Sequence, residues 1–268
     1  MNTIYVVIVL YKISLFEAES YKTLIKPNNI GEYLVYDNSP KQGYTDVSKL
    51  PNGVTYINDT SNSGLSKAYN KAAQIAKEKG YRRVLLLDQD TYFQPESWHK
   101  YLKSIDYEGI TSPQIVTNQR MPFSPVRINK FFKKTEANVP FGTHSLYKYA
   151  VVNSGCCVPT DLFLQCGGYD EKVNLDFSDF QFQVRFRKLC PKFRLIEAQA
   201  VQDFSNDCKD FQKVRNRYLL YLKSAKYFKA DNAINQMKHH CEVLKHCVSL
   251  TLRTRNLCFI KEYISRYL

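Results

Sequence analysis

The sequence lacks the short glycine-rich motifs that hold phosphate groups in the commonest nucleotide-binding enzymes. Neither G-x-x-x-x-G-K-[S/T] nor G-x-G-x-x-G occurs in its 268 residues. Both motifs place backbone N–H groups against phosphate oxygens, the first in P-loop enzymes and the second in dinucleotide-binding enzymes. Their absence argues against both classes, so a phosphate site in this chain would have to be built around a metal ion.

Long hydrophobic runs, internal repeats and low-complexity tracts are also absent. The longest apolar run near the N-terminus, Ile4 to Leu10, has no basic flank and is far shorter than a bilayer span. We therefore expect a first strand there and not a signal peptide. The hydrophobic fraction of 44% and the aromatic fraction of 14% are typical of a packed protein. The length predicts one large α/β domain, or such a domain with a helical appendage.

Cysteine pairs with the spacing of a zinc site are missing as well. The chain has eight cysteines, and none of them forms a C-x-x-C pair. Without a secretory signal, this pattern favours reduced thiols in a cytoplasmic protein over a disulfide framework or a zinc site.

Positive charge is what the chain has in excess. The net charge is +13, and the segment 209–268 contains 13 Lys or Arg against four Asp or Glu. A surface of this sign favours an anionic partner: nucleic acid, membrane lipid or a phosphorylated substrate. Since most of the excess lies in 209–268, we expect this segment to be a basic helical extension of a domain formed by 1–208.

Apolar segments of strand length alternate with helical segments through the first 90 residues. Strands are predicted at 4–10, 32–37, 54–57 and 84–87, and helices at 14–26 and 64–80. This alternation is typical of a parallel sheet with crossover helices. Further along the chain, we expect an irregular insertion at 114–150, a strand at 146–152 and a helix that ends near residue 190.

Two carboxylates follow the most apolar of these strands. Asp88 and Asp90 leave its carboxyl end, and side chains two residues apart on a strand point the same way. Like charges repel each other unless a cation lies between them, and a divalent ion with a diphosphate on its far side would fit. The alternative is a pair of turn-forming aspartates, and the motif alone does not decide between the two.

Other polar side chains are predicted at the same edge of the sheet. Asp37 follows the second strand and could accept a hydrogen bond from a base or ribose. Asn62 to Gly64 could offer backbone N–H groups to an anion, with Lys67 one turn later. An ordinary turn and a simple helix cap explain these residues equally well. Asp179, at a helix start, is either a cap or a base placed at the crevice.

In their order and spacing, these motifs resemble the family 2 glycosyltransferases of the GT-A fold, especially bacterial rhamnosyltransferase-like members that build surface polysaccharides. The matching stretches are Val6–Lys12, Val35–Ser39, Asn62–Asn70, Leu85–Asp90, Asn153–Gly155, Gly167–Glu171 and Asp179–Arg185. The resemblance implies a GT-A (Rossmann-like) α/β fold: a mixed, mostly parallel sheet with flanking helices, here followed by a C-terminal helical extension. It also implies a single displacement that inverts the anomeric carbon.

The resemblance gives each candidate residue a role. Asp179 matches the catalytic base. Donor-nucleotide contacts are implied for Leu10, Tyr11, Asp37, Asn62, Gly64, Lys67, Asp88 and Gln89. Mg²⁺ or Mn²⁺ would be held by Asp88 and Asp90, with Gln202 or Asp203 standing where relatives often have a histidine. Contacts with the donor or acceptor sugar are implied for Asn153, Ser154, Gly155, Asp176 and Arg185.

The resemblance also implies the partners. The donor would be a UDP- or dTDP-sugar, such as galactose, galactofuranose or rhamnose. The acceptor would be a lipid-diphosphate-linked saccharide in O-antigen or capsule biosynthesis.

The basic tail bears on where such an enzyme works. Leu257, Ile260, Ile264 and Tyr267 recur at helical spacing among basic residues, which favours an amphipathic helix on the anionic inner face of the bacterial inner membrane. A plain packed helix explains the same spacing equally well. The competing function is a non-catalytic α/β protein that binds nucleic acid or another anionic surface. A crevice lined by carboxylates argues against nucleic acid as the partner.

Overall fold

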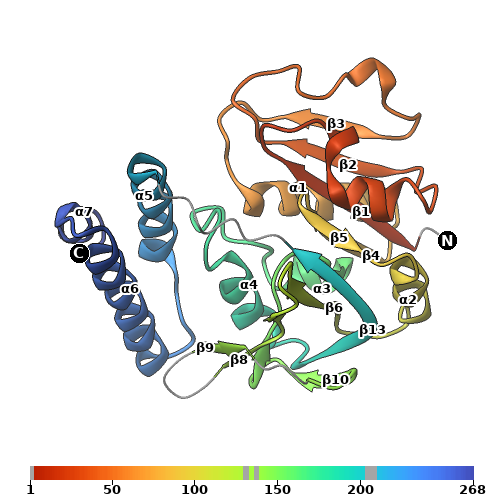
Figure 1. Ribbon diagram of the computed structural model, residues 1–268. Coiled ribbons are helices and arrows are strands. Elements are labelled where there is room, and N and C mark those ends of the chain that lie inside the picture. Colours follow the sequence, from red (N-terminus) through yellow and green to blue (C-terminus); the bar gives the residue numbers. More distant parts are fainter. Residues whose placement is uncertain (1–2, 129–132, 136–138, 203–209) are drawn as a thin grey trace.

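One large sheet forms the body of the molecule (Figure 1). The computed structural model describes residues 3–128, 133–135, 139–202 and 210–268. The sheet has ten strands, in the order β10-β13-β6-β12-β4-β1-β2-β3, with β5 paired to β13 and β7 paired to β6. These strands are β1 (Ile4–Leu10), β2 (Tyr33–Asp37), β3 (Thr55–Asn58), β4 (Arg83–Asp88), β5 (Thr91–Phe93), β6 (Ile110–Thr117), β7 (Pro122–Ser124), β10 (Gly142–Ser145), β12 (Cys157–Pro159) and β13 (Lys192–Gln202).

The strands β1 to β4 run parallel, as the alternation of the sequence predicted. Every side chain of β1 is buried, and successive ones enter different cores: Tyr5 and Val7 pack on one face of the sheet, Val6 and Ile8 on the other. A strand that is covered on both faces has no solvent side for polar residues. This explains the continuous apolar runs of β1 and β4.

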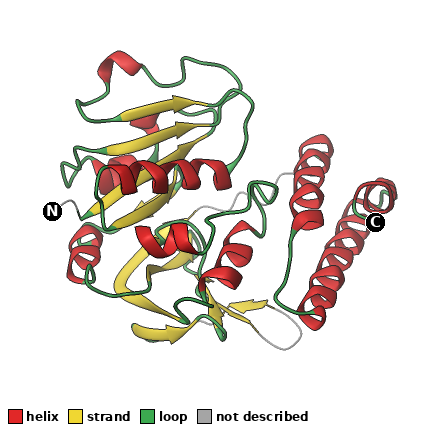
Figure 2. Cartoon of the chain, turned by 180° about the vertical axis from the view of Figure 1, so that it is seen from behind, coloured by secondary structure: helices red, strands yellow, loops and turns green. Residues whose placement is uncertain are grey.

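Helix α1 (Leu65–Glu78) packs along one face of this half of the sheet (Figure 2). Its residues Ala68, Ala72 and Ala76 are fully buried in the same core as Tyr5 and Val7. Their small side chains let the helix lie close to the strands. The predicted helix is confirmed.

The segment 14–26, on the other face, is not the single helix that we expected. A 3₁₀ turn (Leu15–Glu17) is followed by a π-helical turn (Tyr21–Ile25). Between them, the N–H of Glu19 bonds the carbonyl of Gln89 at 2.7 Å, where a continuous helix would bond four residues back. A contact with the turn after β4 has therefore replaced the helical one.

The sheet becomes mixed beyond β4. Strand β12 runs antiparallel to β4 and β6, whereas β13 runs parallel to β6 and antiparallel to β5 and β10. The expected mixed sheet with flanking helices is confirmed. The remaining helices of this part are α2 (Ser97–Lys103), α3 (Thr160–Gln165), α4 (Ser178–Phe186) and a 3₁₀ turn at Val47–Lys49.

The segment 114–150 is more regular than the insertion that we expected. Strands β8 (Val126–Ile128), β9 (Lys133–Thr135) and β11 (Tyr149–Ala150) form a separate three-stranded sheet. The strand expected at 146–152 is therefore reduced to β11. After β11, the N–H of Gly155 bonds the carbonyl of Leu86 at 2.8 Å, so the chain returns to the main sheet at that glycine and continues into β12.

Three helices form the C-terminal extension: α5 (Phe211–Tyr227), α6 (Ala233–Thr254) and α7 (Cys258–Arg266). They lie together beside α4 and bury their own apolar cluster, which includes Tyr218, Leu222, Val243 and Phe259. Among the described helices, none has both the length and the apolar character needed to cross a membrane. The expected division at 208/209 falls outside the described residues, and the two-domain organisation stays a prediction.

Candidate active site

A cleft of about 400 Å³ opens at the carboxyl ends of β1 and β4. Eight of the predicted site residues line it: Leu10, Tyr11, Asn62, Gly64, Asp88, Gln89, Asp90 and Gln202. They come from the ends of three strands and from the loop before α1. The crevice expected at this edge of the sheet is therefore present.

The two predicted metal ligands, Asp88 and Asp90, share one hydrogen-bond donor. The side-chain amide of Gln202 donates to Asp88 Oδ2 at 3.2 Å and to Asp90 Oδ1 at 3.3 Å. The hydroxyl of Tyr69 donates to Asp88 Oδ1 at 3.0 Å. Burial and the charge of Asp90, with a smaller contribution from Asp179, raise the pKa of Asp88 to about 7, although the bonds from Tyr69 and Gln202 oppose this rise. A cation between the two carboxylates would remove the repulsion.

These oxygen atoms suit a hard divalent cation that is shared with a phosphate ligand. Within the described residues, no group of three or more His, Cys, Asp or Glu side chains could hold a metal. Magnesium is often held by only one or two carboxylates when substrate phosphates and waters complete its coordination, so this donor set fits. Rotation of the Gln202 amide would turn Oε1 toward the carboxylates in place of Nε2. The other candidate ligand, Asp203, lies outside the described residues.

Strand pairing and one buried serine fix the position of the turn at the end of β4 that carries Asp88 and Asp90, which we call the acidic turn. Gln202 ends β13, which pairs with β5 so that Gln202 stands opposite Thr91. The hydroxyls of Thr91 and Ser154 lie 2.6 Å apart, and the N–H of Asp88 donates to Ser154 Oγ at 3.4 Å. Ser154 is buried and supports the turn without being part of the cleft lining.

Asn153 and Gly155 also stand outside the cleft lining. The side chain of Asn153 accepts from the Tyr169 hydroxyl at 2.7 Å and donates to Ser178 Oγ at 3.2 Å, next to Asp179. The backbone of Gly155 bonds β4. These residues connect the acidic turn to the start of α4, and their contact with a sugar stays a prediction.

Tyr11 and Gln89, both predicted to bind the nucleotide, are hydrogen-bonded to each other. The N–H of Tyr11 donates to Gln89 Oε1 at 2.7 Å, so the end of β1 is joined to the turn after β4. Both residues line the cleft.

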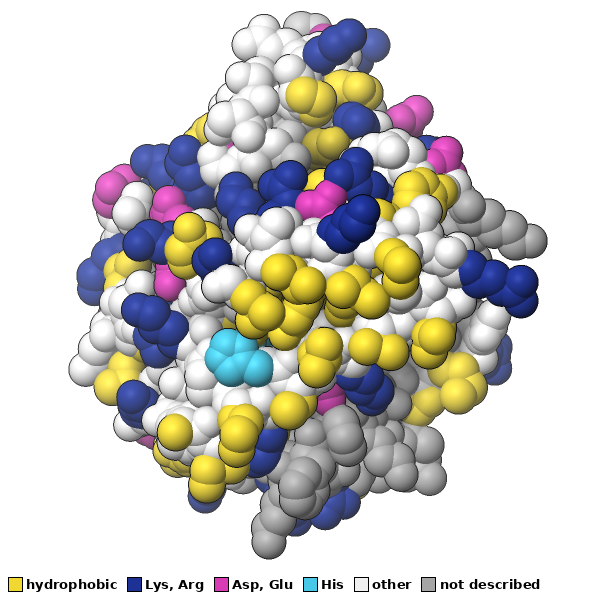
Figure 3. Space-filling view, turned by 90° about the vertical axis from the view of Figure 1, so that its left-hand side faces the viewer, with side chains coloured by type: hydrophobic (Ala, Val, Ile, Leu, Met, Phe, Trp, Pro, Cys, Tyr) yellow, Lys and Arg dark blue, Asp and Glu magenta, His cyan; other side chains and the backbone are white. Residues whose placement is uncertain are grey.

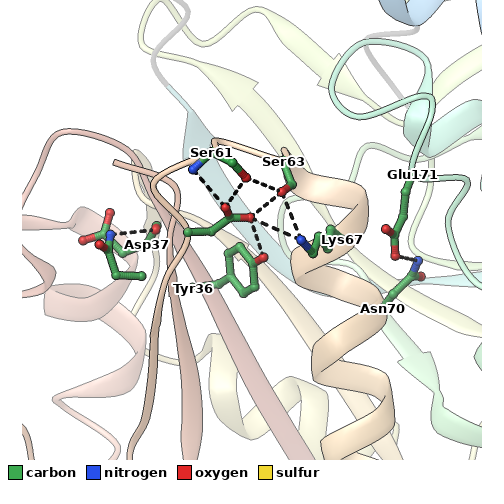
Figure 4. Close-up of polar contacts among 9 residues, drawn as sticks. Tyr36, Asp37, Ser61, Ser63, Lys67, Asn70 and Glu171 are labelled. Carbon is green, nitrogen blue, oxygen red and sulfur yellow. Dashed lines mark hydrogen bonds and ion pairs between the residues drawn. The ribbon is translucent and has the colours of Figure 1, made fainter. Parts of the chain in front are cut away.

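The loop before α1 is organised by Asp59, which contacts four residues that Figure 4 labels: Tyr36, Ser61, Ser63 and Lys67. Its carboxylate accepts from the Tyr36 hydroxyl at 2.8 Å, from the N–H of Ser61 at 3.1 Å and from the hydroxyl of Ser63. Lys67 points back to this cluster, because its Nζ donates to Ser63 Oγ at 3.2 Å and lies 3.8 Å from Asp59. Lys67 is thus held by the loop, and it is not among the residues that line the cleft.

Gly64 allows a close approach at the start of α1. Its φ is +95°, and a Cβ at this position would lie 2.5 Å from the carbonyl oxygen of Asn174. The N–H of Leu65 donates to that same oxygen at 2.8 Å, and the side chain of Asn174 accepts from Ser224 of α5 at 3.2 Å. Asn174 therefore joins α1 to the C-terminal helices.

Asp37 is fully buried and does not line the cleft. Its two oxygens accept from the N–H of Ser39 at 2.9 Å and from the Tyr56 hydroxyl at 2.7 Å. The neighbouring Asn38 lines the cleft instead, and its buried Oδ1 has no hydrogen-bond partner in the described part of the chain. Because an unsatisfied buried acceptor is costly, Asn38 is suited to accept from a ligand donor such as a base N–H.

Asp179 is the second residue of α4 and does not occupy its N-cap position. That position belongs to Phe177, which has a left-handed backbone at φ 65° and makes no side-chain cap bond. Asp179 Oδ1 accepts from the N–H of Phe180 at 2.8 Å. Its charge is one cause of the raised pKa of Asp88, so the two carboxylates lie near each other. Asp179 is therefore not the N-cap residue, although its carboxylate bonds one N–H of the first helical turn, and its role as base stays a prediction.

Comparison with known proteins agrees with this geometry. A sequence model of the glycosyl transferase family 2 matches residues 13–160, which is more than half of the chain. The chain belongs to this family. Its members are glycosyltransferases, so the cleft is the candidate active site of a glycosyltransferase.

Relatives of the whole chain are distant. The dTDP-rhamnosyl transferase RfbF of Shigella flexneri is 24% identical over 245 residues, which are 83% of this chain and 81% of that one. Among solved structures, GalNAc-T7 with UDP, GalNAc and Mn²⁺ has a TM-score of 0.60 at 15% identity and covers 90% of this chain. The chain spans about half, 54%, of that protein. Residues 1–349 of S. aureus TarS with UDP-GlcNAc give a TM-score of 0.51 at 16% identity, over 90% of this chain and 71% of that one. These likenesses confirm the GT-A fold.

The last two predicted sugar contacts of this glycosyltransferase make other bonds. Asp176 accepts from both terminal nitrogens of Arg217 at 2.5 and 2.6 Å. Arg185 donates to the carbonyl of Gly168 and so holds the segment before Asp176. Neither Asp176 nor Arg185 is among the residues that line the cleft.

Sequence reasoning missed seven residues that complete the cleft wall: Val9, Asn38, Leu65, Asn174, Leu175, Arg217 and Leu220. The first three adjoin predicted residues and could have been found from strand and helix ends. Arg217 and Leu220 come from α5, far beyond the family motifs. The only signal for them was the positive charge of the tail.

Proposed function

We propose that this glycosyltransferase moves a sugar from a UDP- or dTDP-sugar to a hydroxyl of a lipid-diphosphate-linked saccharide, with inversion, in O-antigen or capsule biosynthesis. The observation that carries the proposal is the cleft at the ends of β1 and β4, with Asp88 and Asp90 in its wall. The names of the relatives support a nucleotide-sugar donor: one is a dTDP-rhamnosyl transferase, and one is solved with UDP-GlcNAc. Galactose, galactofuranose and rhamnose are the candidate sugars.

Asp88 and Asp90 would hold Mg²⁺ or Mn²⁺ together with the donor diphosphate, and the Oε1 of Gln202 could add a further oxygen ligand. When bound, the divalent ion neutralises the charge that develops on the leaving diphosphate. The nucleoside would lie along Leu10, Tyr11 and Asn38, and the buried Asp37 would hold the turn that presents Asn38.

Asp179 would act as the base. It would take the proton of the acceptor hydroxyl as that oxygen bonds the anomeric carbon, while the bond from this carbon to the diphosphate breaks and its electron pair leaves with the diphosphate. One such displacement inverts the anomeric centre. The position of Asp179 at the start of α4, near Asp88 but outside the acidic pair, supports separate roles for the metal ligands and the base.

The test is a panel of UDP- and dTDP-sugars, in which hydrolysis and transfer are measured with Mn²⁺ and with EDTA. We expect at least one donor to be consumed only in the presence of the metal. In Asp90→Asn, which removes one anionic ligand, calorimetry should show weaker Mn²⁺-dependent binding of the nucleotide. Unchanged and still metal-dependent affinity in this variant would contradict the assignment of Asp90.

The C-terminal helices would place the enzyme on the anionic inner face of the bacterial inner membrane. Figure 3 shows hydrophobic side chains gathered on the side of the molecule that carries these helices. Three exposed apolar residues lie from the end of α6 through α7: Leu252 in α6, Leu257 just before α7 and Ile264 in α7, at 72%, 66% and 58%. Basic residues follow in the same segment: Arg253, Arg255 and Lys261. Exposed apolar side chains beside cations favour an anionic lipid surface.

Sedimentation with vesicles tests this location. The triple variant Leu252→Ser, Leu257→Ser and Ile264→Ser should leave the pellet of anionic vesicles while keeping donor hydrolysis. The matched control is Met121→Ser, which removes an apolar side chain that is 59% exposed elsewhere on the molecule and should sediment as the wild type does. Equal sedimentation of all three proteins would defeat the proposal.

A further inference from the structure

Helix α5 brings a positive charge to the donor cleft. Arg217 and Leu220 line this cleft together with Asp88 and Asp90. Among the described residues of the lining, Arg217 is the only cationic one. The other cations near this edge are engaged elsewhere: Lys67 is bound to the Ser63 hydroxyl, and Lys12 Nζ lies 5.0 Å from the centre of the Tyr11 ring.

The guanidinium of Arg217 already makes a two-pronged contact with an anion. Its terminal nitrogens donate to the two oxygens of Asp176 at 2.5 and 2.6 Å. The Arg217 side chain is 53% exposed and that of Asp176 is 21% exposed. An ion pair with this much access to water adds little to stability, so exchanging its carboxylate for another anion would cost the fold little.

A nucleoside diphosphate would bring more negative charge into a lining whose other described charges are two carboxylates. A divalent ion on Asp88 and Asp90 would offset only part of it. Arginine matches phosphate oxygens in the same forked geometry with which it binds a carboxylate. The guanidinium of Arg217, with its positive charge and two parallel N–H donors, therefore matches the diphosphate in charge and shape.

We propose that Arg217 binds the diphosphate of the donor, exchanging its contact with Asp176 for phosphate oxygens. This rests on the proposed nucleotide-sugar donor and extends the donor site from the family motifs to the C-terminal helices. Asp176 then acts as the competing anion that holds Arg217 at the cleft when no donor is bound.

The proposed exchange predicts that substitutions of Arg217 weaken nucleotide binding, whereas substitution of Asp176 by asparagine does not. Affinity for UDP and dTDP is measured by calorimetry with Mn²⁺ for wild type, Arg217→Gln, Arg217→Lys and Asp176→Asn. Arg217→Gln should bind at least about tenfold more weakly, because a charge-assisted forked contact is lost. Arg217→Lys keeps the positive charge but loses the two parallel N–H donors. Its nucleotide affinity should therefore lie between those of wild type and Arg217→Gln. Asp176→Asn should bind as tightly as wild type or more tightly, since the competing carboxylate is removed.

The control is Lys223→Ala, which removes an exposed cation from the same helix outside the cleft lining and should bind as wild type does. Melting temperatures show whether each variant is folded. If the pair were only a structural link, both partners' variants would lose affinity and thermal stability together, and the proposal would be overturned. Unchanged affinity in folded Arg217→Gln would also overturn it. If wild-type protein bound neither nucleotide, the proposed function itself would fail, which is a separate outcome.

Discussion

Replacing Asp88 by asparagine should stabilise the metal-free protein increasingly as the pH rises. In the folded chain, burial and the neighbouring Asp90 raise the pKa of Asp88 from an ordinary value of 3.8 to about 7. Between these two values the folded state holds a proton that the unfolded chain has released. The free energy of unfolding therefore falls with rising pH, by up to about 1.4 kcal/mol per pH unit. Above about pH 7 both states are ionised and the loss is complete.

The loss of unfolding free energy follows from the difference between the pKa values of Asp88 in the folded and unfolded states. This difference corresponds to at most about 4 kcal/mol. Since Asp88 is only partly buried and water screens its charge, we expect about 2 kcal/mol in practice. Asparagine does not titrate. The difference in unfolding free energy between Asp88→Asn and wild type therefore reports the titration of Asp88 together with its electrostatic coupling to Asp90 and Asp179.

The assay is urea unfolding of both proteins in EDTA at pH values between about 5 and 8. The altered hydrogen bonds to Tyr69 and Gln202 add an offset that does not change with pH, so the slope of the difference is the informative quantity. Asp90→Asn provides a second arm, because loss of its charge lowers the pKa of Asp88 and should flatten the slope. A difference that stays constant over this range would refute the reasoning.

Two further substitutions test other parts of the site. Asp179→Asn should keep its melting temperature and its donor affinity but transfer sugar roughly 10²–10⁴-fold more slowly, because the base is lost; near-normal transfer by the folded variant would remove Asp179 as the base. Gly64→Ala should lower the free energy of unfolding by about 1–3 kcal/mol in thermal or urea melts, since its Cβ meets the carbonyl oxygen of Asn174 at 2.5 Å in a backbone conformation that alanine avoids. An unchanged melting temperature would show that the loop before α1 can move away at no cost.

The sheet and the acidic turn could be predicted from the sequence because their signals are local. The run from Ile4 to Leu10 is apolar throughout since both faces of β1 are covered, and Asp88 follows a strand of the same kind. Ala68 and Ala72 recur at helical spacing because one side of α1 lies on that sheet.

The remaining features depend on contacts between distant segments. The expected helix at 14–26 is interrupted where Glu19 bonds Gln89, a partner 70 positions later. Strand β12 has only three residues, too few for a periodic pattern. Arg217 reaches the cleft through the packing of α5, and no spacing in the sequence relates it to Asp88.

The contribution of α5 to the cleft also orders events during synthesis of the protein. A chain that has emerged only as far as β4 and β13 already contains the acidic pair and Gln202, but it has neither Arg217 nor Leu220 to close the wall. Asn174 joins the start of α1 to Ser224, and it can make the bond with Ser224 only after α5 has been synthesised. The cleft is therefore complete only after α5 has left the ribosome, so a chain that ends before α5 has an open-sided cleft.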